Sequence, residues 1–357
     1  MRRFITDKGL VLCWSVVAPV SIAFGFLFAF LHVPAAWILA AIAASGTSAL
    51  ITGKELPMNR HLFNFARGFI GVLAALPLLS TQLSQLAHFV LPSIAVTIVT
   101  LAIGIGGGLL LARKEPEISQ ETGVLSMLAG GASIMPILAK DLGADYRYVT
   151  LSQYLRLLTV SISLPLITHL FSHTPASHAV SEAAQSQPWW ALLIVVVIAL
   201  VGHRVGKFLR LPAASILGPM LLVVIVGLFI PHDVSLAPPE TVRYFAFLSI
   251  GWICGGSLSL AALKAFAAQL PSTILFVVVL IAGCALTAWP LMSVLHVSYF
   301  EAYLATSPGA LETVLALSSE GGAGSVVVAT QVIRIVSVLA LAGWIPALIA
   351  LLQRKKS

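Results

Sequence analysis

Long apolar segments separated by short polar loops run along almost the whole chain. Most of these segments contain about 20 residues, the length that an α-helix needs to cross a lipid bilayer. Their apolar residues follow one another continuously rather than alternating, which excludes a membrane β-barrel. The pattern therefore predicts an all-α polytopic membrane protein. The predicted segments cover residues 10–31, 33–52, 62–80, 86–112, 119–139, 146–171, 189–209, 212–231, 241–261, 270–295, 299–319 and 326–352.

The order of these segments repeats once along the chain. The motif Gln-x-x-Arg at residues 153–156 recurs at residues 331–334, and Val-Pro-Ala-Ala at residues 33–36 recurs as Leu-Pro-Ala-Ala at residues 211–214, each 178 residues later. We therefore predict two homologous membrane repeats, residues 1–178 and 179–357, with six segments each. In a membrane protein, such a duplication places a binding site where the copies meet.

The fifth segment of each repeat is interrupted by small residues in its middle. Gly130 and Gly131 interrupt the first of these segments, and Pro308 and Gly309 interrupt the second. Each arm of about 8–10 residues is roughly 12–15 Å long as a helix, which is half a bilayer. The two arms would form either a broken spanning helix or a re-entrant hairpin.

Composition and charge distribution refine this picture. Hydrophobic residues make up 59% of the chain and charged residues only 9%, whereas a soluble domain carries about 25% charged residues. The net charge of +7 is spread over short loops, which favours a topological role over nucleic-acid binding. If the fifth segments are hairpins, 17 of the 20 Lys and Arg residues face the cytoplasm; if all segments cross, 12 do. We therefore expect five crossings and one hairpin per repeat, inverted repeats, and cytoplasmic N- and C-termini.

Two arginines, Arg156 and Arg334, lie near the middle of the last segment of each repeat. A buried arginine costs several kcal/mol unless it has a partner, so it is a functional candidate by default. Gln153 and Gln331 lie three residues earlier, on the same helical face. Either the arginines contact a substrate anion, or they hold their hairpins through backbone carbonyl groups.

Glu312 makes the two repeats different, because its counterpart in the first repeat is Ile134. We expect Glu312 to pair with Arg334, as a proton-coupling pair or as a static counter-ion. This would leave Arg156 without a carboxylate and available for an anion. Arg67, near a segment end, is expected to extend its charged group to the membrane surface.

The hairpin tips supply further candidate ligands. A helical arm that begins after the glycines would point its N-terminal amides at the bilayer centre, where they attract carboxylates or phosphates. Glycine and proline there could equally serve close helix packing. The predicted substrate-binding residues are Arg156, Arg334, Gln153, Gln331, Gly130, Gly131, Ser133, Ser307, Pro308 and Gly309, with Glu312 as the coupling residue.

Motifs for catalysis or cofactor binding are not visible in the sequence. The three cysteines, Cys13, Cys254 and Cys284, lie in apolar segments without metal-ligand spacing. We therefore expect no enzyme activity, no metal and no cofactor. The expected partners are the lipid bilayer and a small-molecule ligand, without direct nucleic-acid binding, and a homodimer is left open.

The small-residue breaks Ala-Gly-Gly-Ala and Ser-Pro-Gly-Ala-Leu-Glu, Gly-Ala-Asp at residues 143–145 and the two Gln-x-x-Arg motifs resemble the bacterial AbrB membrane-duplication family. The resemblance covers both repeats, although Gly-Gly-Ala at residues 321–323 replaces Gly-Ala-Asp in the second. It implies a multi-pass protein of the bacterial inner membrane, labelled as a regulator of gene expression or sometimes as an ammonia monooxygenase. A monooxygenase needs a metal site, which the residues do not supply, and no soluble DNA-binding module is present.

Taken together, inverted repeats, broken segments and buried arginines favour a secondary transporter for a small anionic metabolite, working by alternating access. The alternative is a membrane sensor or regulator that binds a ligand and acts indirectly on gene expression.

Overall fold

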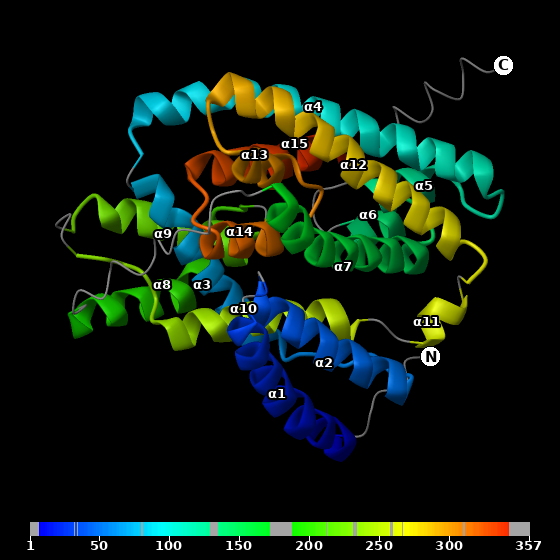
Figure 1. The fold of residues 1–357 in the computed structure, drawn as a ribbon, viewed down its shortest axis with the longest axis horizontal. Helices are drawn as coiled ribbons and strands as arrows, with labels where there is room; N and C mark the ends of the chain where they lie inside the picture. The colour runs from blue at the N-terminus through cyan, green and yellow to red at the C-terminus, as the bar shows by residue number, and fades with distance from the viewer. Residues whose placement is uncertain are drawn as a thin grey trace. The chain divides into compact units, whose positions relative to one another are not determined.

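The structure, a computed structural model, describes residues 7–342 except 32, 34, 80, 129–134, 172–187, 212, 231–233, 258–259, 266 and 310. Every regular element in this part of the chain is a helix, which confirms the predicted all-α class (Figure 1). The helices are α1 (Asp7–Phe30), α2 (Ala36–Thr52), α3 (Arg60–Leu79), α4 (Leu83–Lys114), α5 (Gln120–Met127), α6 (Met135–Asp141), α7 (Tyr146–Phe171), α8 (Trp189–Phe208), α9 (Ala214–Gly227), α10 (Glu240–Gly256), α11 (Leu260–Ala265), α12 (Leu270–Leu295), α13 (Tyr299–Thr306), α14 (Leu311–Glu320) and α15 (Ser325–Ala342).

Five of the described helices are long and apolar enough to cross a membrane, as the apolar pattern predicts. They are Leu10–Phe30, Arg60–Leu79, Ser84–Lys114, Trp189–Phe208 and Leu270–Leu295. Three shorter apolar helices are Ala36–Thr52, Ala214–Gly227 and Ser325–Val338. Large apolar side chains lie exposed on several of these helices, for example Phe30 at 79% and Leu91 at 77%. Such a surface suits contact with lipid, whereas water would penalise it.

The chain folds into two compact units that differ from the two sequence repeats. Unit 1 contains Met1–Leu83, Ser161–Leu260 and Glu312–Val328, and unit 2 contains Ser84–Val160, Ala261–Leu311 and Ala329–Ser357. The first boundary between the units lies after Leu83 in the first repeat and after Leu260 in the second. These two places are nearly equivalent positions within the repeats. Each unit therefore combines the corresponding parts of both repeats. Glu312–Val328 is an exception, because its counterpart, residues 134–150, belongs to unit 2.

The duplication is visible in the backbone at the start of α2 and α9. Ala35 and Ala213, 178 residues apart, precede these helices and both adopt the left-handed conformation, with φ of 56° and 46°. Residues other than glycine adopt this conformation at a cost of about 1–2 kcal/mol. The first alanine after the shared proline therefore has the same backbone conformation in both repeats.

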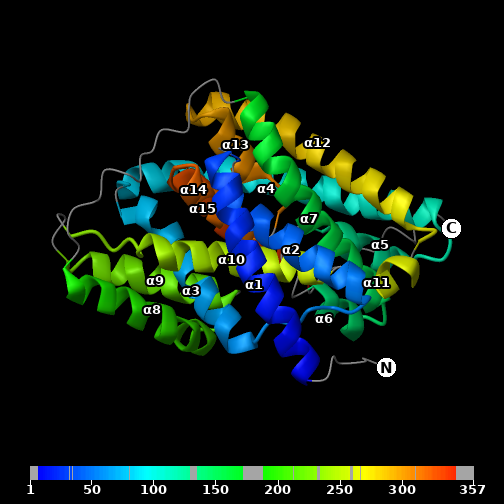
Figure 2. The same ribbon diagram turned by 60° about the horizontal axis from the view of Figure 1, so that its bottom comes forward.

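Helices of the two repeats pack against each other inside unit 1. Helix α2 packs against α1 and α10, and α9 packs against α3 and α8; α8 and α9 run side by side in Figure 2. A Cβ atom added to Gly251 of α10 would come within 2.4 Å of the Ile38 carbonyl oxygen in α2. A Cβ on Gly71 of α3 would come within 2.3 Å of the Ile216 carbonyl oxygen in α9. Ile38 and Ile216 are equivalent positions, so the same glycine-mediated contact occurs twice.

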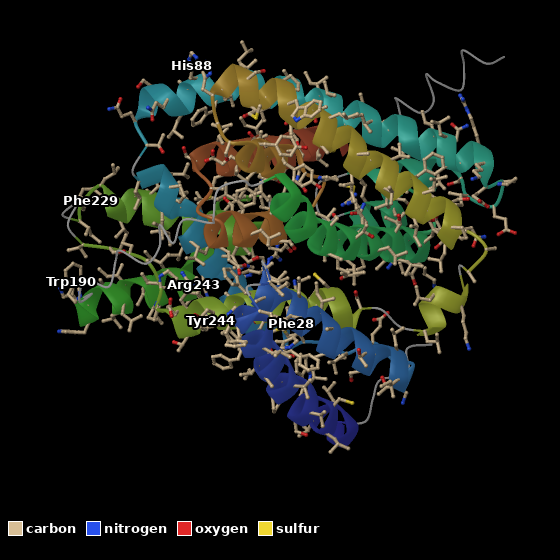
Figure 3. All side chains as sticks on the ribbon, in the orientation of Figure 1. Phe28, His88, Trp190, Phe229, Arg243 and Tyr244 are labelled. Carbon is tan, nitrogen blue, oxygen red and sulfur yellow. The ribbon has the colours of Figure 1, made fainter. Side chains whose placement is uncertain are left out.

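An aromatic contact reinforces the packing of α2 on α10. Trp37 stacks on Tyr244, with ring centroids 4.2 Å apart, and Tyr244 is labelled in Figure 3 beside Arg243. Arg243 pairs with Glu240 at 3.1 Å at the start of α10.

Unit 2 is held by an apolar core and by polar contacts at the helix ends. Its hydrophobic cluster joins α4, α5, α6, α7 and α15 through Leu101, Leu125, Leu128, Met135, Val149 and Val338, among others. After the end of α4, Glu115 accepts a hydrogen bond from Ser272, and Glu117 accepts one from Gln269, at the start of α12. The hydrophobic cluster brings the end of α5 beside α7.

Candidate functional site

The chain is interrupted in the fifth segment of both repeats, where the sequence predicts it. Helix α5 ends at Met127 and α6 begins at Met135, whereas α13 ends at Thr306 and α14 begins at Leu311. A helix that ends inside a protein leaves its last carbonyl groups without intrahelical partners. These groups need donors from elsewhere in the fold.

The predicted ligands at the two breaks are described to different extents. Ser307, Pro308 and Gly309 lie in the second break and are buried. Gly130, Gly131 and Ser133 lie outside the described residues, so their predicted role stays a prediction.

In the first repeat, the donors come from the Gln-x-x-Arg motif of α7. Arg156 donates from Nη1 to the Leu128 carbonyl oxygen at 2.8 Å and to the Met127 carbonyl oxygen at 3.4 Å. Gln153 donates from Nε2 to the carbonyl oxygens of Leu125 at 2.8 Å and Leu128 at 3.1 Å. The Arg156 Nη2 group donates to Gln153 Oε1 at 2.6 Å. Together the two side chains hold the carboxyl end of α5.

The second repeat contains the same arrangement on α15. Gln331 donates from Nε2 to the Leu304 carbonyl oxygen at 2.8 Å. Arg334 donates to the Ser307 carbonyl oxygen, to the Gly309 carbonyl oxygen at 3.3 Å, and to Gln331 Oε1. These contacts hold the carboxyl end of α13.

We call each of these arrangements a Gln-Arg clamp. A spacing of three residues places the amide and the guanidinium on one helical face, and the partial negative charge at a helix C-terminus favours a cation there. Of the two sequence interpretations of Arg156 and Arg334, the structure shows the contacts to backbone carbonyl groups. Contact with a substrate anion stays a prediction.

The two guanidinium groups are buried without a carboxylate. Arg156 is 1% exposed and Arg334 is 3% exposed, and the ion pairs found among the described residues are Arg67–Glu312 and Arg243–Glu240. Arg156 lies within electrostatic range of Arg334, and Cys284 lies within range of both. Two like charges in a medium of low dielectric constant repel each other. The pair would therefore be stabilised by an anion.

Two hydrogen-bonding groups near the clamps have no partner among the described residues. They are Nε of Arg156 and the hydroxyl oxygen of Ser307, and both are buried. Thr306, next to Ser307, donates to the Cys284 carbonyl oxygen at 2.9 Å and so ties α13 to α12. A ligand could use the two unpaired groups without breaking either clamp.

The predicted pair of Glu312 with Arg334 is wrong. Glu312 belongs to unit 1 and pairs with Arg67 of α3 at 3.4 Å, whereas Arg334 is already engaged by carbonyl groups of the second break. The expected extension of Arg67 to the membrane surface stays a prediction; its side chain is 11% exposed. Its guanidinium also lies 5.3 Å from the ring centroid of Phe63. The sequence marks Glu312 as a charge within an apolar segment, but its ion-pair partner depends on how the helices pack.

The chain is similar to known proteins over most of its length. The AbrB family model, described as transition state regulatory protein AbrB, matches residues 37–352, which include both breaks and both clamps. The "Putative regulator AbrB" of Escherichia coli (strain K12) is 32% identical over 336 residues, covering 92% of this chain and 94% of that protein. The "Uncharacterized protein YhjN" of Bacillus subtilis (strain 168) is 25% identical over 344 residues, covering 90% of this chain and 89% of that protein. With its long apolar helices and duplicated clamps, the chain belongs to the AbrB family.

Proposed function

We propose that this protein is a secondary transporter for a small organic anion in the bacterial inner membrane. The observation that carries the proposal is the pair of buried guanidinium groups, Arg156 and Arg334, which have no carboxylate partner among the described residues. An uncompensated buried charge is costly, and an anion that enters the site offsets this cost.

The clamps determine how such an anion would be recognised. Both Nη groups of each arginine are already bonded to carbonyl or amide oxygens. The arginines therefore contribute mainly positive potential, and the direct donors left are Arg156 Nε and the Ser307 hydroxyl. Weak direct contacts combined with a strong field suit a transported substrate, which must leave the site as readily as it enters.

Broken helices at equivalent places of two repeats support transport over static binding. Secondary transporters built from repeats form their substrate sites at interrupted helices, where exposed backbone groups meet the substrate. The present breaks lie at the same position of each repeat and are held by the same motif. We propose Glu312 as the coupling residue, because it is a carboxylate inside an apolar segment and pairs with the partly buried cation Arg67.

Reconstitution of the purified protein in proteoliposomes tests the proposal. Uptake of a panel of labelled carboxylates and phosphates would be measured with wild type, R156Q, R334Q and the surface control K140Q. We expect at least one anion to be accumulated by wild type and K140Q, and its uptake to be reduced at least tenfold in both arginine variants. If no anion on the panel is taken up by correctly folded wild-type protein, the proposal fails.

A second function, a membrane sensor that acts indirectly on gene expression, is favoured by the printed name of the Escherichia coli relative. Flux separates the two functions. A sensor would bind the anion with the same dependence on Arg156 and Arg334, but vesicles would not accumulate it.

A further inference from the structure

A groove of about 370 Å³ lies between α4 and α15 in unit 2. Its volume is at the lower end of the range for small-molecule sites, about 300–1,000 Å³. Ile98, at 61% exposure, lies at the rim, whereas Thr97 and Leu101 are almost completely buried at the floor. On a membrane-spanning helix, an exposed apolar rim faces lipid, so the groove opens toward the bilayer. The lining residues are Thr97, Ile98, Leu101, Ser337, Ala340 and Leu341.

The floor of this groove is continuous with the core that carries the first clamp. Leu101 belongs to the same hydrophobic cluster as Leu125 and Leu128, and Leu341 packs against that cluster. The backbone carbonyl groups of Leu125 and Leu128 are the acceptors of the first clamp. The groove and the clamped end of α5 are therefore parts of one packed region.

The groove lies next to the second clamp along the sequence of α15. Ser337, which lines the groove, follows Arg334 by three residues, a rise of about 4.5 Å along the helix. Thr330, one turn before Arg334, hydrogen-bonds to Ser93 of α4 at 2.7 Å. Polar groups thus follow the α4–α15 contact on both sides of the arginine.

The Thr97 hydroxyl is an independent sign of a ligand. It lines the groove, its residue is 1% exposed, and it has no hydrogen-bond partner among the described residues. A buried hydroxyl without a partner is destabilising. An aliphatic chain alone would leave this cost in place, whereas a ligand with a polar end would satisfy the hydroxyl.

We propose that the anion bound by this protein is amphiphilic: a carboxylate with one apolar chain. The inference rests on the proposed anion function and names its substrate class. The carboxylate accepts a hydrogen bond from the Thr97 hydroxyl at the floor of the groove, in the positive potential of Arg156 and Arg334, and the apolar chain extends along the groove between α4 and α15. A groove open to lipid also allows such a molecule to enter from the bilayer, where its chain partitions.

A series of acids of increasing length tests whether the apolar chain of the ligand binds in the groove. Acetate, butanoate, hexanoate, octanoate and decanoate would be titrated against the full-length protein in lipid nanodiscs, with the matching 1-alkanols and empty nanodiscs as references. We expect the dissociation constant of the acids to fall about fourfold per added methylene until the groove is filled. At equal chain length, each alcohol should bind at least tenfold more weakly than the acid.

Two variants test whether the gain in affinity with chain length comes from the groove. Ala340→Trp fills the groove from its exposed rim, and it should abolish the gain in affinity with chain length across the acid series. Leu110→Trp places the same ring on a lipid-exposed site of α4 that does not line the groove, and it should keep the gain.

The outcomes separate the two proposals. If no carboxylate binds, the amphiphilic carboxylate is overturned, and the proposed anion function fails as well if phosphates are not taken up in the proteoliposome assay. If short and long acids bind equally, anion binding stands and the amphiphilic substrate class is overturned. If alcohols bind as tightly as acids, or if Ala340→Trp keeps the gain with chain length, the groove holds apolar membrane material and the inference is overturned.

Discussion

The Gln-Arg clamp predicts a specific coupling energy within each repeat. Gln153 holds two carbonyl groups of α5 and accepts a hydrogen bond from Arg156 at 2.6 Å. Replacing both residues with methionine, separately and together, removes the polar groups at nearly constant length. Each single variant loses the energy of the Gln153–Arg156 hydrogen bond, and the double variant loses it only once. The difference between the double effect and the sum of the single effects therefore gives the energy of this bond.

The expected coupling energy follows from the measured contributions of two kinds of hydrogen bond. A hydrogen bond to a charged group contributes about 1.5–3 kcal/mol in proteins, and bonds between membrane helices contribute about 0.6 kcal/mol on average with a maximum near 1.7. The bond from Arg156 is short, charged and fully buried, so we expect about 1.5 kcal/mol. The single effect of R156M is not the test, because removing a buried charge also removes its desolvation cost.

The assay is reversible unfolding in mixed micelles, with Q153M, R156M and Q153M/R156M compared with wild type. The equivalent cycle of Gln331 and Arg334 should give the same coupling energy, because the donor and acceptor groups are the same. The crossed pair Q153M/R334M shares no hydrogen bond and should couple by less than about 0.5 kcal/mol. Coupling below that value within both clamps would refute the view that the motif acts as a unit.

Three further variants test the remaining contacts. Glu312→Gln should destabilise the protein by about 1–2 kcal/mol, because the partly buried Arg67 keeps its charge without a carboxylate, and replacing both residues with methionine should recover most of the loss in the same unfolding assay. Gly251→Ala should lower the unfolding midpoint, because the added Cβ would lie 2.4 Å from a carbonyl oxygen of α2, whereas Gly106→Ala, with nothing within 4 Å, should be neutral or stabilising by up to about 1 kcal/mol; equal effects of the two would contradict the close helix contact. Ser307→Ala removes a hydroxyl without a partner, so it should change stability by less than about 0.5 kcal/mol but weaken anion binding in titrations, and unchanged binding would remove Ser307 from the proposed site.

Several elements could be located from the pattern of residues alone. The predicted segments 146–171 and 270–295 match α7 and α12, and the segment at 299–319 is interrupted at Ser307–Gly309 as expected. These features depend on local composition, because an apolar run long enough for a bilayer forms a helix and Pro-Gly interrupts it. Helix α11 (Leu260–Ala265) was not predicted, since its six residues follow an apolar segment without a clear break.

The duplicated motifs also identify residues of the candidate site from the sequence alone. Two Gln-x-x-Arg motifs 178 residues apart identified the buried arginines, and the structure gives them equivalent contacts. Which contacts they make was not determined, because carbonyl groups and a bound anion are both acceptors for a guanidinium.

Sequence alone determined the membrane class, the duplication, the helix breaks and the buried arginines, because each follows from composition or from spacing along the chain. The tertiary structure decided which parts of the repeats form each compact unit and which residues satisfy the buried charges. Glu312 shows the reason: its partner Arg67 is distant in the chain, and no local pattern distinguishes it from Arg334. The packing of helices selects the partner, since burial requires that a charge be compensated but not by which residue.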